Sequence, residues 1–399
     1  MVTLANESIR YIKAAAVAGA CGLSYLLLAA CPFVARQWWA FAMFGSFVLY
    51  LNSSPGRRGI ALSLFAGAIS LCRLRFFGGL YHPYTFVEDN IAALGAFAGA
   101  GCLFALASSC LLARSKRARS EAADCLLLCI SLPCALILID YVLLKTTTQL
   151  SFDRVLLACD GVLGMQPSYL VARIVESHPP ALRVFRLVYD ALPLAIACGY
   201  AASSRASAPW LAKSLILAGV IGRPLHFLVP AAGPRWALTG LFPAVLPAIT
   251  AHWMRPFDLK AIFNCVPSLH LGWALLIFWQ LRRGKSTVAT VISAVFLACT
   301  AVSTLALGEH YLFDLIIAVP FTLMIEALCI RGFLTDWDRR RTSAALVGTA
   351  LSAGLAFLIR SGRLLQFSAP AAWVLVAAIL LLSVFLETRL VGAAKPDCI

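Results

Sequence analysis

The stretch STLALGEHYLFD, residues 303–314, places a glutamate, a histidine and an aspartate within six residues, between two long apolar runs. His310 and Asp314 are four residues apart, so a helix would present them on one face. The carboxylate can then accept a hydrogen bond from one imidazole nitrogen and leave the other unprotonated. Such a histidine is an oriented nucleophile or base. The same spacing also suits a structural pair at a membrane interface.

A second histidine, His270, follows Pro267 and Ser268 in the stretch NCVPSLHLGWALL. Pro and Ser are ordinary residues at a helix start, where free backbone N–H groups and the helix dipole favour a phosphate. An imidazole at that point can protonate a departing oxygen. The two histidine motifs lie about 40 residues apart, and together they are more specific than either alone.

The composition identifies an integral membrane protein. The chain has 399 residues, of which 61% are hydrophobic and only 13% charged, and its mean hydropathy is +0.87. A bilayer core needs roughly 20 apolar residues per helix, and such runs recur from end to end. The 14 cysteines lie mostly inside these runs without metal-ligand spacing. We expect neither a metal nor another cofactor, since no suitable carboxylate cluster occurs.

The formal net charge of +15 does not indicate a nucleic-acid partner. The basic residues stand in short clusters between apolar runs, which is the distribution of cytoplasmic loops. These clusters are RR at 57–58, RSKRAR at 114–119, RRGK at 282–285 and RRR at 339–341.

Apolar length and loop signals predict an all-α, polytopic fold with about twelve transmembrane helices. The expected spans are 12–35, 37–52, 59–80, 91–113, 121–145, 186–204, 210–230, 266–281, 286–307, 311–332, 342–360 and 369–389. We divide the chain into an N-terminal membrane region of about four helices at 1–120, a six-helix catalytic core at 121–332, and a C-terminal two-helix extension at 333–399.

A cytoplasmic N-terminus places every basic cluster on the cytoplasmic side. The connections at 146–185 and 231–265 then lie outside, where re-entrant or interfacial segments could roof a lipid-facing site. His270 and His310 fall at the same outer ends of neighbouring helices. We therefore expect a bacterial inner membrane or its equivalent, with the active site on the non-cytoplasmic side.

The motifs VPSLH and STLALGEHYLFD resemble the second and third signatures, PSGH and SRxxxxxHxxxD, of the type-2 phosphatidic acid phosphatase superfamily. The resemblance implies that His310 attacks phosphorus to form a phosphohistidine and that Asp314 orients it. It also implies that His270 acts as the general acid. The broader likeness covers about 121–332, with the tight motif match at 264–320.

Two departures from these signatures are informative. Leu269 replaces the usual glycine, and Thr304 stands where the phosphatase motif has an arginine. Both departures are similar to the fungal inositol phosphorylceramide synthase branch, which reads PSLH and ST followed by HYxxD. That resemblance implies a transferase of phospho-head groups. Glu309 occupies a variable position in the motif, and we expect it to be a solvated acid at a helix start.

The first superfamily signature, KxxxxxxRP, is incomplete. The GRP at 222–224 has Ile216 at the lysine position, and Lys213 is out of register. A dianion in a membrane site needs fixed positive partners. We select Ser268, Arg223 and Arg235 as phosphate-binding candidates, while Arg223 could instead snorkel to the interface. Other nearby basic groups are His226, Arg255 and Lys260.

Three functions remain open from the sequence. The first is an inositolphosphotransferase that passes a lipid head group through a phosphohistidine to an acceptor alcohol. The second is a lipid phosphate phosphatase that hydrolyses phosphatidate or polyprenyl phosphate with water as acceptor. The third is a non-catalytic lipid transporter or scaffold. The expected partners are the membrane, a phospholipid or lipid-phosphate substrate, and an acceptor alcohol or water.

Overall fold

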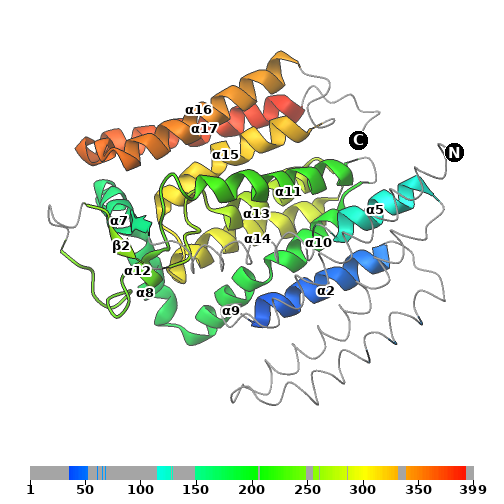
Figure 1. Ribbon diagram of the computed structural model, residues 1–399, viewed down its shortest axis with the longest axis horizontal. Coiled ribbons are helices and arrows are strands. Elements are labelled where there is room, and N and C mark those ends of the chain that lie inside the picture. The colour runs from blue at the N-terminus through cyan, green and yellow to red at the C-terminus, as the bar shows by residue number, and fades with distance from the viewer. Residues whose placement is uncertain are drawn as a thin grey trace. The chain divides into compact units, whose positions relative to one another are not determined.

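A computed structural model shows a helical chain with one small sheet (Figure 1). It describes residues 36–52, 61, 65, 68, 115–126, 128, 149–204, 207–248, 255–259, 261–284, 286–330 and 338–391. The chain separates into two compact units, Met1–Ile139 with Asp190–Ser203, and Asp140–Tyr189 with Ser204–Ile399. The division into domains at 120 and 332 stays a prediction.

The first unit contains three described helices. These are α2 (Arg36–Asn52), α5 (Lys116–Leu126) and α10 (Leu192–Ala202). Helix α2 packs against both α5 and α10. The predicted span 37–52 therefore exists as a helix, although its 17 residues are short for a bilayer crossing.

The second unit carries the two histidine motifs. Its elements are β1 (Gln149–Ser151), α7 (Asp153–Val162), α8 (Pro167–Glu176), α9 (Pro179–Asp190), α11 (Ala208–Leu225), α12 (Pro234–Ala237), β2 (Phe257–Leu259), α13 (Leu269–Arg282), α14 (Thr287–Ala306), α15 (Leu312–Cys329), α16 (Arg339–Arg360), η2 (Arg363–Gln366) and α17 (Ala369–Val391).

Helix α15 lies at the centre of the second unit. It packs against α11, α13, α16 and α17, and Figure 1 shows α16 and α17 running side by side along it. The sequence LFDLIIAVPFTLMIEALC is apolar on every face, as a helix surrounded by others must be. In the apolar stretch of α15, 78% of the residues are buried inside the protein. The corresponding share is 28% in α14 and in α16, and 22% in α17. The outer helices therefore leave most of their apolar surface for lipid.

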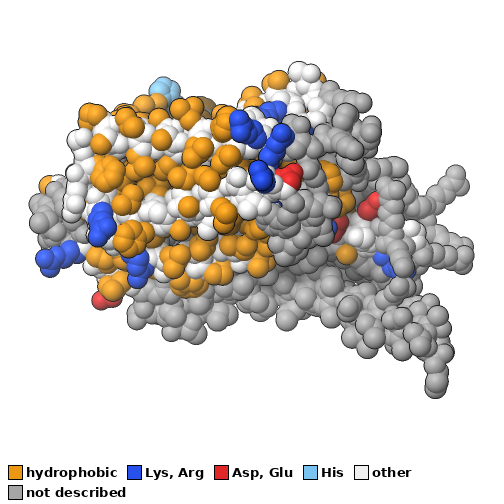
Figure 2. Space-filling model, turned by 90° about the horizontal axis from the view of Figure 1, so that it is seen from above, with side chains coloured by type: hydrophobic (Ala, Val, Ile, Leu, Met, Phe, Trp, Pro, Cys, Tyr) orange, Lys and Arg blue, Asp and Glu red, His pale blue; other side chains and the backbone are white. Residues whose placement is uncertain are grey.

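Four described helices are long and apolar enough to cross a membrane, namely α14, α15, α16 and α17. A fifth span results if the bent pair α7 and α8 counts as one. Figure 2 shows a broad face dominated by hydrophobic side chains, with Lys and Arg gathered toward its ends. Such a face indicates an integral membrane protein.

The predicted number of about twelve spans is not confirmed. The spans 12–35 and 91–113 lie outside the described residues, as do most of 59–80 and 121–145. The expected span 186–204 is interrupted, because α9 ends at Asp190 and α10 begins at Leu192 with Pro193 in its first turn. Helix α13 has 14 residues, roughly 21 Å at 1.5 Å per residue, and falls short of a bilayer core.

Each of the two long connections contains at least one helix and a strand. Helices α7 and α8 meet at 93°, across a turn in which Gly164 has φ of +81° and Pro167 starts the next helix. Strand β1 from the first connection pairs antiparallel with β2 from the second, with Gln149 opposite Leu259. The sheet therefore ties the two connections to each other. The re-entrant character predicted for 146–185 is consistent with this broken helix.

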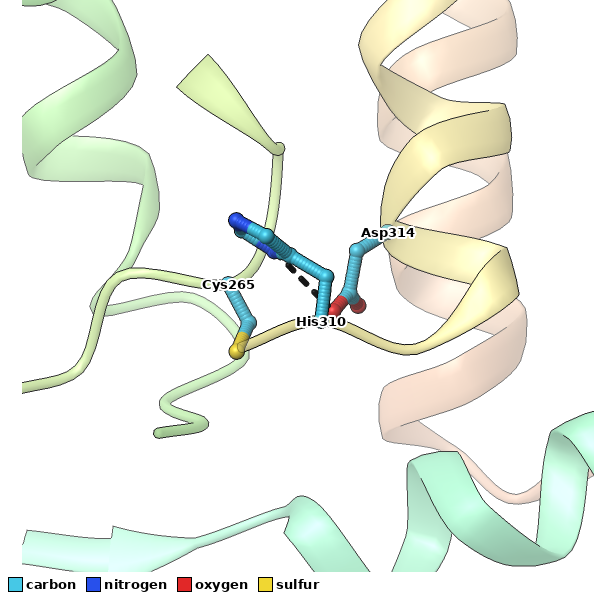
Figure 3. Close-up of side chains that lie close together, drawn as sticks. All are labelled: Cys265, His310 and Asp314. Atoms are coloured by element: carbon cyan, nitrogen blue, oxygen red, sulfur yellow. Dashed lines mark ion pairs between the residues drawn. The ribbon is translucent and has the colours of Figure 1, made fainter. Parts of the chain in front are cut away.

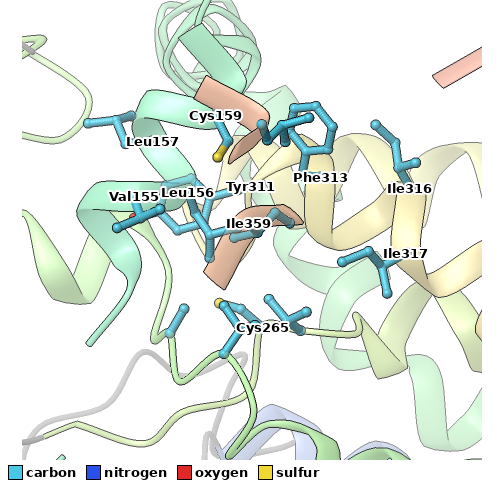
Figure 4. Packing of buried hydrophobic residues seen from close by; sticks show 14 of the residues in the cluster. Val155, Leu156, Leu157, Cys159, Cys265, Tyr311, Phe313, Ile316, Ile317 and Ile359 are labelled. Carbon is cyan, nitrogen blue, oxygen red and sulfur yellow. The ribbon is translucent and has the colours of Figure 1, made fainter. Parts of the chain in front are cut away.

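An apolar cluster joins α7 to the start of α15. Figure 4 shows Leu156 and Cys159 of α7 packed with Phe313 and Ile317 of α15, together with Ile359 of α16. Each of these five side chains is at most 2% exposed. Close packing of this kind fixes α7 beside the turn that carries His310.

Candidate functional site

His310 and Asp314 lie together at the beginning of α15. Nδ1 of His310 is 3.5 Å from Oδ2 of Asp314, and both side chains are buried (Figure 3). The pair does not share a helical face as predicted, because His310 precedes the helix, which starts at Leu312. The Asp314 carboxylate instead reaches back, and its Oδ2 accepts a hydrogen bond of 2.8 Å from Tyr311 N. A helix-start carboxylate thus both caps α15 and faces the imidazole.

Ser268 joins the two histidine motifs. Its Oγ lies 3.2 Å from Nε2 of His310, and its backbone N–H donates to the carbonyl of Asp314 at 3.3 Å. The same hydroxyl caps α13 by accepting from Leu271 N. The phosphate-binding candidate Ser268 therefore touches the nitrogen of His310 that faces away from Asp314.

His270 lies beside His310, as the predicted topology requires. The ring centroids are 6.2 Å apart and the ring planes meet at 62°. Tyr189 stacks on the ring of His270, with centroids 4.0 Å apart and planes at 13°. Aromatic stacking fixes the imidazole plane next to the buried His310.

Arg223 is buried in α11 and its Nη1 lies 2.8 Å from Nδ1 of His226. A guanidinium only donates, so Nδ1 of His226 accepts and the imidazole proton sits on Nε2. That nitrogen donates to the carbonyl of Pro267 at 3.1 Å. Arg223 and the carbonyl of Pro267 thus occupy both nitrogens of the buried imidazole of His226. His226 thereby connects Arg223 to the PSLH motif.

The second arginine candidate, Arg235, lies beside the turn that precedes His310, where its backbone N–H donates to the carbonyl of Gly308 at 3.0 Å. It is exposed, and its Nη1 is 3.7 Å from Oε1 of Glu309. Glu309 also accepts a hydrogen bond of 3.0 Å from Trp236 Nε1. The expectation of a solvated Glu309 is wrong, since only 9% of the residue is exposed. Burial raises the pKa of this carboxyl above its usual value.

The remaining basic candidates are placed differently. Arg255 is exposed, and Lys260 lies outside the described residues. Lys213 is close enough to Cys329, at the far end of α15, to perturb its electrostatics. It therefore stands away from His310, in agreement with its broken register in the first motif.

Thr304 does not replace the missing arginine as a phosphate ligand. Its hydroxyl donates to the carbonyl of Ala301 within α14 at 2.9 Å. Its own carbonyl accepts from the backbone N–H groups of Glu309 and His310, at 3.0 and 3.2 Å. Thr304 thus shapes the turn before the nucleophile candidate through its backbone.

The unusual Leu269 is accommodated by a neighbouring glycine. Gly222 of α11 lies so close to Leu269 that a Cβ there would overlap the leucine side chain. The bulk added in the PSLH motif is therefore matched by a small residue on the facing helix.

Sequence reasoning missed Cys265, which completes a group of three potential metal ligands. The sulfur of Cys265, an imidazole nitrogen of His310 and a carboxylate oxygen of Asp314 all lie within 4.8 Å of one another (Figure 3). Thiolate, imidazole and carboxylate are the donors that zinc prefers. Cys265 carries no motif of its own, so only the fold reveals this proximity.

Comparison with known proteins supports the assignment of these motifs. The sequence model described as the PAP2 superfamily matches residues 154–328, from α7 through α15. This segment includes both histidine motifs and the arginine of α11. Searches of curated proteins and of solved structures returned no match. A match to this superfamily is consistent with a lipid phosphatase or phosphotransferase.

Proposed function

We propose that the protein is a membrane phosphotransferase of the inositol phosphorylceramide synthase type, which carries a lipid phospho-head group on His310. The observation that carries this proposal is the convergence of the buried His310, Asp314 and Ser268 with the partly buried His270 in one cluster. Two segments about 40 residues apart in the sequence supply these side chains. A histidine with an acidic partner on one nitrogen and a hydroxyl on the other suits nucleophilic catalysis.

In the first half-reaction, Nε2 of His310 attacks phosphorus and the bond from phosphorus to the lipid oxygen breaks. His270 gives its proton to that oxygen, and the lipid alcohol leaves. Asp314 stabilises the positive charge that develops on His310, because its carboxylate faces Nδ1 at 3.5 Å. The product is a phosphohistidine and a neutral His270.

In the second half-reaction, His270 accepts the proton of an incoming hydroxyl. The hydroxyl oxygen bonds to phosphorus, and the bond to His310 breaks. Ser268 is placed to donate to a phosphoryl oxygen, because its hydroxyl already lies against Nε2 of His310. We assign Arg223 and Arg235 to the phosphate charge, because a dianion needs fixed positive partners.

Two observations favour an alcohol over water as the acceptor. His310 is fully buried, which limits the access of bulk water to a phosphohistidine. Leu269, which resembles the synthase branch at this position, also packs against Gly222, a residue small enough to accommodate it. Hydrolysis to free phosphate is the second candidate function, and the match to the PAP2 superfamily supports it equally.

The test is to incubate detergent-purified protein with phosphate-labelled phospholipids, with and without inositol or a lipid alcohol. A labelled lipid that forms only with an added alcohol supports the transferase. Free phosphate formed without an acceptor supports the phosphatase instead. His310→Ala should lose turnover, whereas His178→Ala removes an exposed histidine and should retain it. Unchanged turnover in His310→Ala would refute the mechanism and reopen a transport or scaffold role.

The non-cytoplasmic location of the site is also part of the proposal. Thr239→Cys places an exposed thiol in the connection that joins α12 to β2, and Arg340→Cys places one in the fourth basic cluster, at 339–341. A membrane-impermeant thiol reagent should label Thr239→Cys in intact cells and Arg340→Cys only after permeabilisation. The reverse pattern would place the site on the cytoplasmic side.

A further inference from the structure

Two aspartates of α7 are completely buried. Asp153 and Asp160 are each 0% exposed, and their spacing of seven residues puts them on one face of the helix. The apolar cluster holds that helix against the start of α15 (Figure 4). Buried carboxylates are costly unless donors satisfy them, so their partners indicate what they do.

Asp160 accepts hydrogen bonds from the beginning of α15. Its Oδ2 accepts from Leu312 N at 2.9 Å, and its Oδ1 accepts from Phe313 N at 3.2 Å. Asp314 accepts a hydrogen bond from the backbone N–H of Tyr311 in the same turn. Three successive N–H groups after His310 are therefore held by two carboxylates. A helix start with satisfied amides has a fixed position.

Asp153 holds the same turn from a second side. Its Oδ1 accepts from the hydroxyl of Tyr311 at 3.0 Å and from Gly233 N at 2.8 Å. The amide of Ala232 and the hydroxyl of Ser151 also donate to this carboxylate. Asp153 thus connects the residue after His310 to the segment 232–233.

The segment around Gly233 lies directly on the turn before His310. Gly233 has φ of +96°, and a Cβ there would stand 2.5 Å from the carbonyl oxygen of Glu309. Arg235 N donates to the carbonyl of Gly308 at 3.0 Å. Asp153 therefore fixes both the turn that carries His310 and the segment around Gly233 that lies against this turn.

We propose that Asp153 and Asp160 are positioning residues for His310, and we name the pair the α7 clamp. The inference rests on the proposed function of His310 as the nucleophile. Neither carboxylate makes a described contact with His310 itself. They act through Tyr311, Leu312 and Phe313, which set the backbone from which the imidazole projects. Misplacement of a reacting group by about 1 Å can cost roughly 10²-fold in rate.

Two variants test the clamp by different routes. Asp160→Asn keeps the shape but turns one acceptor into a donor, opposite an amide that also donates. Tyr311→Phe removes only the hydroxyl that reaches Asp153. Asp258→Asn is the matched control, because Asp258 is an exposed acid on β2. We expect kcat to fall about 10–10²-fold in both clamp variants, with KM changed less than about twofold. The control should match the wild type.

Hydrogen exchange separates failure of the clamp from failure of the proposed function. The amides of residues 311–313 should exchange faster in Asp160→Asn than in the wild type, while exchange in α14 stays unchanged. An active wild type with unaltered kcat in both clamp variants would overturn the positioning role. A wild type that processes no lipid phosphate would refute the proposed function instead. In that case, unchanged exchange at 311–313 would also overturn the clamp.

Discussion

Oγ of Ser268 lies 3.2 Å from Nε2 of His310, although 42 residues separate them in the sequence. The hydroxyl occupies the side of the imidazole from which the proposed attack on phosphorus starts. In the proposed reaction the hydroxyl exchanges this contact for one to the phosphoryl group. Ser268 therefore links the cap of α13 to the chemistry of α15.

Ser268→Ala should reduce both stability and activity. Loss of the helix cap costs about 0.5–2 kcal/mol, and loss of one donor to a transferring group lowers kcat by about 10²-fold. Ser286→Ala is the matched control, because Ser286 caps α14 by accepting from Ala289 N at 3.2 Å. Thermal melting and initial rates should show a similar stability loss in both variants and a rate loss only in Ser268→Ala. Equal rates in the two variants would exclude a role for the hydroxyl in the reaction.

Gly222→Ala should destabilise the packing of α11 on α13. The added methyl group overlaps Leu269, and overpacking of a core costs typically 1–3 kcal/mol. Leu269→Ala in the same chain should relieve the overlap, so the double variant should be more stable than the sum of the single changes predicts. A denaturation series in detergent measures this coupling. Additive effects would show that the two side chains are independent.

A thiophilic cation such as Cd²⁺ or Zn²⁺ should inhibit turnover. Cys265, His310 and Asp314 offer three ligand atoms within 4.8 Å, and a bound cation would occupy the proposed nucleophile His310. Cys265→Ser should weaken the inhibition about tenfold or more, because it removes the soft ligand. Cys198→Ser, at an exposed cysteine, is the control. Identical inhibition of the wild type and Cys265→Ser would argue against binding at this group.

Glu387→Gln should destabilise the fold without changing the chemistry. Arg283 at the end of α13 contacts Glu387 of α17 at 2.6 Å and Glu326 of α15 at 2.5 Å. Breaking a buried ion pair costs about 3–5 kcal/mol. Arg283 is 13 residues from His270, roughly 20 Å along the helix. We expect a lower melting temperature with kcat and KM unchanged, and a large drop in kcat would show that the two ends of α13 are coupled.

Motif spacing was sufficient to predict which side chains meet. His310, Asp314, His270 and Ser268 all belong to short local motifs, and the alternation of spans places the motifs at one end of neighbouring helices. The register at His310 was wrong, because a helix pattern does not reveal where the first turn begins. Here Tyr311 is the N-cap, so His310 stays outside the helix.

The sequence alone did not predict contacts between residues that are far apart in the chain. Cys265, His226, Asp153 and Asp160 have no spacing that marks them, and each gains meaning only from residues that the fold brings near. The number of spans is not confirmed, partly because several expected spans lie outside the described residues and partly for a physical reason. A run of apolar residues does not distinguish a helix in lipid from a helix buried in protein. The short helices α10 and α13 were therefore predicted as parts of membrane spans.

The hydrogen bonds between α7 and α15 also constrain the order of biosynthesis. Asp160 meets its partner Leu312 across 152 residues of chain. At about 5–20 residues per second, α7 leaves the ribosome roughly 8–30 s before those amides exist. During that interval neither aspartate of α7 has its α15 donors, and hydrocarbon would penalise both charges. The hydrogen bonds that hold α7 to α15 can therefore form only after the chain has been made as far as α15, so the segment around His310 takes its final form late in synthesis.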